Sequence, residues 1–392
     1  MFDAIVVGAR CAGASAALLL ARAGRKVLLI DRSEFPSDTM STLYLHQPGV
    51  ARLARWGLLP AVAASGCPKL DRVTYQVRDV RLQGAAAVLG DVDGTYAPRR
   101  AVLDKIVADA AVAAGAEFRD ATRLVRLTGD DRVDGVVLRD RAGGEVVEKA
   151  HVVIGADGMR STVARLACAP PVRSDPLATC VYYSFWQGLP AHFEFHERTG
   201  GWVAVIPTND GLTIIATYLP QDRFATIRAD PLAGHLDAVR TTAPGVFDRA
   251  MAAERVDRLH GTGDQRNFFR QAWGPGWALI GDAGHHKDSI TARGITDAML
   301  QAELLADSIA PCLDDPVRLD AAAQEFGVAR DKTLVEVYRS TLATARLEVG
   351  PARLAMLRAI STSPDLTSRY FGVIAGMNSM DDLITPDLLA RL

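Results

Sequence analysis

Three glycine-bearing segments, widely separated along the chain, constrain the fold more than any other feature of the sequence. They are residues 5–13 (IVVGARCAG), 152–158 (VVIGADG) and 277–285 (WALIGDAGH). In each of them an apolar run leads into glycine, a pattern typical of a buried strand followed by a tight turn. Their order and spacing predict that distant parts of the chain build one nucleotide site.

The N-terminal pattern predicts a βαβ unit. Residues 3–7 form a short apolar strand, residues 13–23 an Ala/Leu-rich helix ended by Gly24, and residues 26–30 a second apolar strand. Such a unit implies parallel strands joined by a right-handed crossover. Further along we expect helices at 49–56 and 101–114, strands at 72–77, 81–89, 121–138 and 145–154, a strand-rich stretch at 180–219, and helices after the third segment with breaks at Pro311, Pro316, 350–351 and Pro364.

The predicted fold class is therefore α/β. A Rossmann-like nucleotide-binding domain with a βαβ core is expected to be interleaved with an antiparallel β-sheet domain for the substrate, followed by a C-terminal helical segment. We expect the nucleotide-binding domain in residues 1–70, 97–170 and 270–310, the substrate domain in residues 71–96 and 171–269, and the helical region in residues 311–392.

Size and composition narrow the classes of partner. A chain of 392 residues is long enough for two packed cores, and its net charge of -2 gives no reason to expect nucleic acid or an anionic membrane. Five scattered cysteines form no metal-like cluster and suit a reducing compartment. No apolar run approaches the roughly 20 residues of a membrane span, and an apolar strand at the start leaves no room for a signal peptide. We expect a cytoplasmic monomer or homodimer without a metal.

The first glycine segment departs from the dinucleotide fingerprint at one position. In G-x-G-x-x-G the first glycine makes the turn, the second lets the backbone approach a pyrophosphate and the third allows close packing. Gly8 and Gly13 hold the outer positions, whereas Arg10 stands at the middle one. Arg10 could add a cation beside the phosphate or face the nicotinamide entrance, and a plain tight turn before a core helix remains an alternative. The expected phosphate contacts are Gly8, Ala9, Arg10, Cys11, Ala12 and Gly13.

Acidic residues at two other strand ends extend the predicted site. Asp31 lies about 20 residues beyond the glycine loop, where a carboxylate accepts from ribose hydroxyls, although a cap or turn role stays open. Arg32 beside it could stack near an adenine or reach a phosphate. Asp282 could accept from ribityl hydroxyls, and a helix starting at Gly294 would point free N–H groups at the pyrimidine edge of a flavin. The set predicts FAD.

Together these motifs resemble those of the flavoprotein monooxygenases with the para-hydroxybenzoate hydroxylase fold, a superfamily that also contains geranylgeranyl reductases. The resemblance covers the chain to about Leu305 and implies non-covalent FAD with NAD(P)H as cosubstrate. The chain departs from the family pattern at Arg10, which stands in place of the second glycine, and at Ser289, where the family often has proline. The site residues it implies are Gly8 to Gly13 for pyrophosphate, Asp31 for adenosine ribose, Arg100 of an R-x-x-L helix start for pyrophosphate or ribityl, Asp157 for FAD and the nicotinamide cosubstrate, Gly281 and Asp282 for ribityl, and Gly294 and Ile295 for the ring.

What the resemblance implies about activity is a monooxygenase that uses molecular oxygen, through a flavin C4a-hydroperoxide, to hydroxylate or epoxidise a small hydrophobic or aromatic substrate. Two alternatives stay open: an FAD-dependent reductase similar to the geranylgeranyl reductases, and a flavin-binding protein without turnover. Flavin-dependent halogenases need W-x-W-x-I-P, and residues 202–207 (WVAVIP) lack the second tryptophan. We therefore rank halogenation low.

No catalytic residue can be named from the sequence. His46 is the candidate acid or base, with a cap or surface position as its alternative, and His285 is expected to pack beneath the flavin loop. Strand alternation places His192 and His196 on one face, where we expect solvent exposure. The aromatic segments 183–186 and 201–202 are predicted to face the flavin ring, although a purely structural sheet core would have the same pattern.

Overall fold

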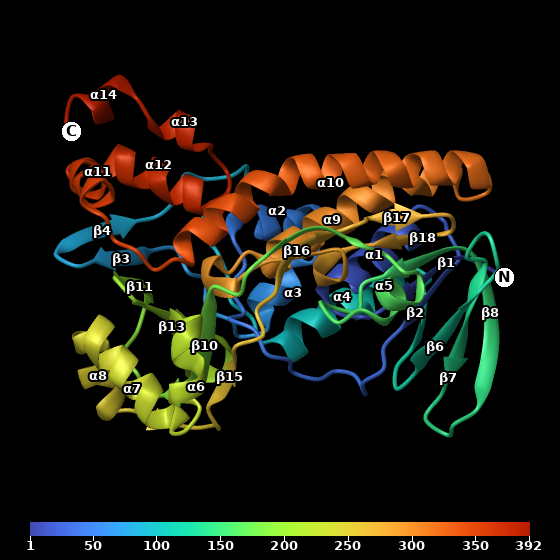
Figure 1. Ribbon diagram of the computed structural model, residues 1–392, viewed down its shortest axis with the longest axis horizontal. Coiled ribbons are helices and arrows are strands. Elements are labelled where there is room, and N and C mark those ends of the chain that lie inside the picture. Colours follow the sequence, from blue (N-terminus) through green and yellow to red (C-terminus); the bar gives the residue numbers. More distant parts are fainter.

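The computed structural model describes residues 1–392 and divides into two sheet-based halves under a layer of C-terminal helices. Figure 1 shows the parallel strands on the right, the antiparallel sheet on the left and helix α10 (Pro316–Thr344) running across the top. No helix has the length and apolar character needed to cross a bilayer.

The parallel sheet forms around the predicted βαβ unit. β1 (Phe2–Val7) pairs in parallel with β2 (Val27–Ile30), with Ala4 opposite Val27, and α1 (Cys11–Arg22) connects them. The strand order β17-β18-β8-β1-β2-β5 brings the ends of all three glycine segments to neighbouring strands. The remaining strands of this path are β5 (Glu117–Arg119), β8 (Glu145–Gly155), β17 (Trp273–Gly274) and β18 (Trp277–Leu279). This architecture confirms the predicted α/β fold class.

One predicted strand is two strands. The stretch expected as a single strand at 121–138 is a hairpin of β6 (Arg123–Thr128) and β7 (Gly135–Arg139), and β7 pairs with the outer part of β8. Gly129 has a φ of +95°, a conformation that favours glycine, so the chain turns there. The single-strand prediction was wrong because this turn breaks the alternation.

The second sheet is antiparallel except where an early segment joins it. Its order is β14-β10-β13-β12-β11-β3-β4, and β3 (Val73–Val77) lies parallel to β11 (Phe193–Arg198) although more than 100 residues separate them. Figure 1 shows these two strands side by side in different colours. β4 (Val80–Gly84) ends at Gly84, five residues before the predicted end. The other strands are β10 (Thr179–Gln187), β12 (Gly201–Pro207), β13 (Leu212–Pro220), β14 (Glu254–Arg255) and β15 (His260–Thr262).

A third, small sheet has the order β19-β16-β9. Its strands are β9 (Pro171–Asp175), β16 (Asn267–Arg270) and β19 (His285–His286). The division of the chain into domains at the predicted residue bounds stays a prediction.

Helices cover both sheets. The C-terminal helices α10, α11 (Pro351–Ser361) and α12 (Pro364–Ala375) each start with proline at the first helical position, so the predicted breaks at these prolines are helix starts. The others are α2 (Gln47–Arg55), α3 (Leu59–Ala64), α4 (Arg100–Ala113), α5 (Thr162–Leu166), α6 (Phe224–Ile227), α7 (Pro231–Thr242), α8 (Pro244–Met251), α9 (Gly294–Ile309), α13 (Met380–Leu383) and α14 (Pro386–Leu389).

The core is divided between the sheet faces. The largest cluster of buried apolar side chains lies where α1, α4 and α9 pack against one face of the parallel sheet. A second large cluster lies between the antiparallel sheet and the helices α11 and α12. A smaller one packs α7 and α8 on the opposite face of the antiparallel sheet. The inner face of the antiparallel sheet therefore meets the C-terminal helices.

Candidate functional site

A cleft of about 420 Å³ gathers the three glycine segments into one site. It opens at the carboxyl ends of the parallel strands, where ligands bind in open α/β sheets. Ala9 and Gly13 lie buried behind its wall, and His46 lies outside it. The predicted cofactor residues that line the cleft are Gly8, Arg10, Cys11, Ala12, Asp31, Arg32, Arg100, Asp157, Gly281, Asp282, Gly294 and Ile295.

Steric constraints require glycine at both positions 8 and 13 of the first turn. Gly8 has a φ of +106°, and a Cβ there would lie 2.5 Å from the carbonyl oxygen of Ala156. A Cβ on Gly13 would lie 1.8 Å from the carbonyl oxygen of Gly8. Arg10 between them has extended backbone with φ −85° and ψ −171°, which any residue adopts. The close contact of α1 with β1 therefore depends on the outer glycines and not on a glycine at position 10.

Asp31 and Asp157 both anchor the backbone beside the cleft. The Asp31 carboxylate accepts hydrogen bonds from the amides of Ala9 and Ser33, each at 2.9 Å. Asp157 accepts from the amide of Thr162 at 2.6 Å and from the hydroxyl of Ser161, contacts that fix the start of α5. A carboxylate has about four lone-pair positions, so both can still accept from ribose hydroxyls. Their predicted cofactor contacts stay predictions.

A buried charge cluster beside the glycine loop was not predicted. Asp104, fully buried on α4, accepts from the Cys11 amide at 3.1 Å and forms ion pairs with Arg10 at 3.2 Å and Arg100 at 3.0 Å. Burial alone would lower the pKa of Arg100, but Asp104 more than offsets this and raises it. The spacing of Arg100 and Asp104, one helical turn, was the available signal.

A second buried charge cluster lies where α9 begins. Asp297 forms ion pairs with Lys287 and with Arg293, the latter at 3.1 Å, and all three side chains are buried. Burial would raise the pKa of Asp297, but Lys287 and then Arg293 outweigh this and hold it well below its usual value. Arg293 also donates to the carbonyl of Ala375 at the end of α12. The cluster thus ties the α9 start to the C-terminal helices.

A second cavity, of about 460 Å³, lies behind the segment 289–294. Ser289, Ala292 and Gly294 face the cleft, whereas Ile290, Thr291 and Arg293 line the cavity. Apolar side chains make up just over half of its lining, which includes Tyr75, Phe195, Trp202, Val337, Met356, Tyr370, Val373 and Ile374. One short segment therefore lies between the cleft and a second space whose wall is partly apolar and partly open to solvent.

The aromatic side chains predicted to share one face lie on both faces of the antiparallel sheet. Tyr183 and Trp202 belong to the cluster between the antiparallel sheet and the C-terminal helices, and Tyr183 accepts a hydrogen bond from the amide of Ser41. Trp186 packs on the opposite face against α7 and α8. The prediction for Trp186 was wrong because side chains alternate along β10, so residues 183 and 186 point to opposite sides.

The predicted solvent exposure of His192 and His196 is wrong for His196. Glu194 is buried and accepts from His196 at 2.9 Å, while Arg249 of α8 forms an ion pair with it at 2.9 Å. His196 is half-buried as a result, whereas His192 has 44% of its side chain exposed. α8 covers this face of the sheet, which the strand pattern alone did not indicate.

His46 contacts the segment behind the cleft. Its Nε2 lies 2.9 Å from the carbonyl oxygen of Thr291, so Nε2 carries the proton and donates, and its ring packs edge-on against Tyr44. Burial and then the nearby Arg293 lower the pKa of His46 to about 3. His46 is therefore neutral near pH 7 and is poorly suited to exchange protons there.

We expect His46→Gln to leave the pH profile of turnover unchanged between about pH 5 and 8, because the wild-type imidazole does not titrate in that range. Glutamine keeps an N–H donor for Thr291, so kcat should change by no more than about threefold, the range of a retained neutral hydrogen bond. Steady-state rates against pH, with the exposed His192→Gln as control, check this. A limb near pH 6.5 that disappears only in His46→Gln would show that the residue is an acid or base.

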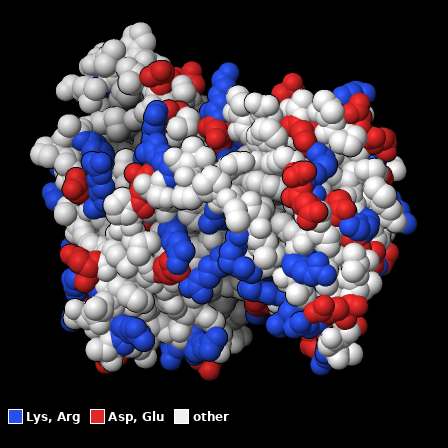
Figure 2. Space-filling model, turned by 45° about the vertical axis from the view of Figure 1, so that its right-hand side comes forward, with Lys and Arg blue, Asp and Glu red and all other residues white.

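Charges on the surface are mixed, with one basic hollow next to the cleft. Figure 2 shows Lys and Arg interspersed with Asp and Glu, and a group of basic side chains near the middle of that face. Beside the turn after β8, a hollow of about 750 Å³ is lined by Arg160, Arg165, Arg266 and Arg270. Two carboxylates also line the hollow: Asp264, which Arg160 and Arg266 share, and Asp175. Basic side chains are therefore in excess. This hollow suits an anionic group.

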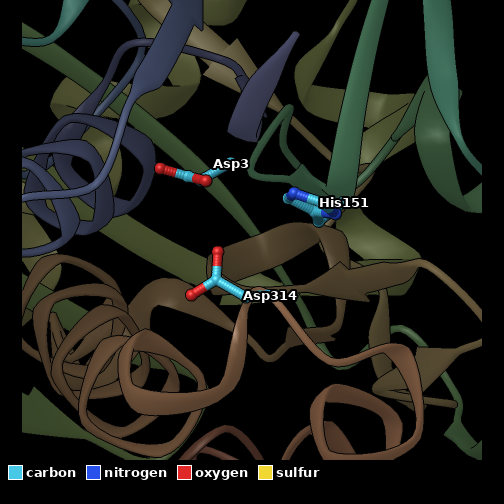
Figure 3. Close-up of side chains that lie close together, drawn as sticks. All are labelled: Asp3, His151 and Asp314. Carbon is cyan, nitrogen blue, oxygen red and sulfur yellow. The ribbon is translucent and has the colours of Figure 1, made fainter.

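Asp3, His151 and Asp314 lie together at the opposite edge of the parallel sheet, and Figure 3 shows their side chains around a common centre. Two of them already have partners: Asp3 accepts from the amide of Lys26 at 2.6 Å, and Asp314 pairs with Arg25 at 2.8 Å. We assign no metal to this group.

Comparison with known proteins identifies the family. The profile of the FAD binding domain family matches residues 1–330. The chain belongs to this family. The cofactor in the family's name fits the cleft, because the tight glycine turn, the start of α1 and the carboxylates of Asp31 and Asp157 line it together. Family membership confirms the predicted resemblance and FAD binding.

Relatives of this family include enzymes with different reactions. The chain is 28% identical over 309 residues to a digeranylgeranylglycerophospholipid reductase of Methanosarcina acetivorans, covering 76% of this chain and 72% of that one. It is 27% identical over 343 residues to a menaquinone reductase of Mycolicibacterium smegmatis, covering 78% and 75%.

Solved structures show the same fold. The flavin-dependent brominase Bmp2 superposes with a TM-score of 0.84 at 18% identity, covering 100% of this chain and 97% of that one. PqsL of Pseudomonas aeruginosa, described as a probable FAD-dependent monooxygenase, superposes with a TM-score of 0.69 at 20% identity, covering 95% and 99%.

Proposed function

We propose that this FAD-dependent oxidoreductase is an NAD(P)H-dependent monooxygenase that hydroxylates or epoxidises a small hydrophobic or aromatic substrate. The observation that carries the proposal is the cavity of about 460 Å³ that shares the wall segment 289–294 with the FAD cleft. Pockets of this size bury most of a drug-sized molecule. A substrate there would lie next to the segment that borders the cofactor cleft, against the apolar side chains of the cavity wall.

The charges in the cavity wall favour an uncharged substrate. Arg353 is paired with Glu197 at 2.6 Å, and Arg293 with Asp297 at 3.1 Å, so neither guanidinium is free to bind an anion. Arg346 and Glu348, which carry opposite charges, are exposed to solvent. Apolar contacts would therefore supply most of the binding, with hydroxyl groups of α10 available for orientation.

The roles of this chain's residues follow from the site. Bound FAD supplies the redox chemistry and the activation of oxygen. Arg100 and the glycine-loop amides would hold its pyrophosphate, Asp31 its adenosine ribose and Asp282 its ribityl chain. The amides at Gly294 would face the flavin ring and stabilise negative charge there.

The side chains that could donate a proton in or beside the cavity favour oxygen transfer over reduction of a double bond. His46, which donates to the Thr291 carbonyl, is neutral, and burial raises the pKa values of the Tyr75 and Tyr370 hydroxyls in the cavity wall. None of these three groups readily releases a proton near pH 7. A reductase would need a proton donor for the substrate carbon at this place. A monooxygenase needs mainly orientation and exclusion of water.

A reductase is the second candidate, because the two sequence relatives described above are named as reductases. One experiment separates the readings: incubate the FAD-loaded protein with NADPH or NADH and a panel of phenols, quinones and polyketides, and follow oxygen uptake and product mass. The proposal requires substrate-stimulated oxygen uptake and a product that gains one oxygen atom. A product that gains two hydrogens identifies a reductase, and no stimulated turnover with any reductant identifies a binding protein.

The basic hollow next to the cleft is the proposed contact for the phosphates of the nicotinamide cosubstrate. Removing two of its cations in Arg165→Gln/Arg266→Gln should raise KM for NADPH by about tenfold, equivalent to about 1.4 kcal/mol, and leave kcat near the wild-type value. The extra phosphate makes NADPH more sensitive than NADH. Steady-state NADPH and NADH oxidation measures this, with Lys105→Gln on the exposed face of α4 as control. A KM for NADPH that is equal in the double variant and the wild type would show that the hollow does not bind the cosubstrate.

A further inference from the structure

A protein carboxylate, that of Asp104, already occupies the N-terminus of α1 on the wall of the FAD cleft. It is fully buried, and its Oδ1 accepts from the amide of Cys11 at 3.1 Å and from the Cys11 thiol at 2.9 Å. The Cys11 amide is one of the free N–H groups that a helix start would otherwise present to a phosphate. Asp104 thus uses part of the helix N-terminus and places a negative charge beside the pyrophosphate position.

Two arginines meet this charge from different elements. Arg10 reaches Oδ2 at 3.2 Å from the glycine loop, and Arg100 approaches both carboxylate oxygens from one turn earlier on α4. Arg10 also donates to the carbonyl oxygen and to the hydroxyl of Ser37, at 3.0 and 3.2 Å. With two guanidinium groups and one carboxylate, the cluster carries a single net positive charge.

The side chain of Arg10 leaves the loop without obstructing it. Position 10 has extended backbone, so glycine is not needed there for conformation. The guanidinium is turned toward α4 and Ser37, and Gly8 keeps its place on the cleft wall. An arginine at the second glycine position is therefore compatible with the backbone approach that a pyrophosphate requires.

We propose that Arg10 supplies the second positive charge beside Asp104, so that the cluster of Arg10, Arg100 and Asp104 presents a net positive charge to the FAD pyrophosphate. The inference rests on the family's FAD binding and not on the reaction proposed above. Without Arg10, Arg100 alone would balance Asp104, the cluster would be neutral, and the diphosphate would lose the attraction of a net positive charge. Removing Arg10 alone should therefore weaken FAD binding, whereas removing Arg10 and Asp104 together keeps the net charge of the cluster.

A double-mutant cycle tests this. FAD is titrated into the apoproteins of wild type, Arg10→Gly, Asp104→Asn and the double variant, with flavin fluorescence as readout. Arg10→Gly should weaken FAD by about ten- to a hundredfold, the range for a lost charge-assisted contact. The double variant, which regains the single positive charge through Arg100, should bind within about threefold of wild type, since non-additivity reports direct coupling. A double variant as weak as Arg10→Gly, or an Arg10→Gly protein with undiminished affinity, would overturn the proposal.

Two further measurements keep the result interpretable. ADP has the pyrophosphate but no flavin, so its affinity should change across the variants in the same pattern as that of FAD. The affinity for riboflavin, which has no pyrophosphate, should be the same in all variants. Arg10→Gln keeps donors for Ser37 without the charge and should resemble Arg10→Gly, so that a folding defect specific to glycine is detected by thermal unfolding. Arg25→Gln removes a cation at the opposite edge of the sheet and should leave FAD affinity unchanged. Because binding alone is measured, the outcome does not depend on which reaction the enzyme performs.

Discussion

Gly13→Ala is expected to yield a protein without bound FAD and with reduced stability. The added Cβ would lie 1.8 Å from the Gly8 carbonyl oxygen and 3.1 Å from the Cβ of Ala156. The first contact is with backbone, so α1 must move away from β1, and the turn that carries the phosphate-binding amides moves with it. Overpacking a tight site typically costs about 1–3 kcal/mol. A displacement of this loop should weaken FAD by about a hundredfold or more, since each tenfold corresponds to about 1.4 kcal/mol.

The flavin absorbance of the purified variant and its thermal unfolding curve measure both effects. Gly245→Ala is the matched control, because no atom lies within 4 Å of a Cβ there and the residue is in α8 with ordinary helical backbone. Alanine should stabilise that helix slightly, by about 0.4–1 kcal/mol, and FAD content should not change. If Gly13→Ala retained full flavin content, the close packing of α1 on β1 would not be what forms the site.

Asp297→Asn should destabilise the protein by about 3–5 kcal/mol, the usual cost of breaking a buried ion pair from one side. The substitution leaves Lys287 and Arg293 buried without a counter-charge, and it loosens the segment that separates the cleft from the cavity. Flavin content should fall as well, because the start of α9 is no longer fixed. Urea unfolding at pH 7 measures the change, with the exposed Asp109→Asn on α4 as control, expected within about 0.5 kcal/mol.

The same carboxylate predicts a pH dependence. The pKa of Asp297 is depressed in the folded protein, so its contribution is fully present above the unfolded pKa of about 3.9 and is lost as pH falls below that value. The stability difference between wild type and Asp297→Asn should therefore be constant from about pH 5 to 7 and shrink at lower pH. A difference that grew on acidification would mean that Asp297 is protonated in the native state.

Sequence patterns were sufficient for the βαβ unit and the glycine turns of the parallel half, though not for the β6–β7 hairpin. The βαβ unit of β1, α1 and β2 follows from local periodicity and glycine positions, and the three glycine segments do meet at one cleft. Local patterns carry this information because the turn geometry at Gly8 and Gly13 is set by sterics within a few residues.

The elements missed by sequence reasoning depend on partners distant in the chain. Asp104 looks like an ordinary helix residue until α4 packs on α1 and brings Arg10 to it. Lys287 and Asp297 read as loop and helix residues, and only their burial makes them a pair. The covered face of β11 likewise depends on α8, which starts more than 40 residues later. Such contacts are set by tertiary packing, which residue spacing does not report.

The position of β18 in the sheet has a consequence for synthesis of the protein on the ribosome. β8 lies between β1 and β18. Until residues 277–279 have been made, β8 therefore has a parallel partner strand on one side only. Residues 281 and 282, which line the cleft, follow directly. Since chains emerge at about 5–20 residues per second, the N-terminal βαβ unit must wait tens of seconds in an incomplete sheet. Nascent chains of this protein should therefore acquire FAD late, and chaperones that shield open sheet edges are expected to bind them before that point.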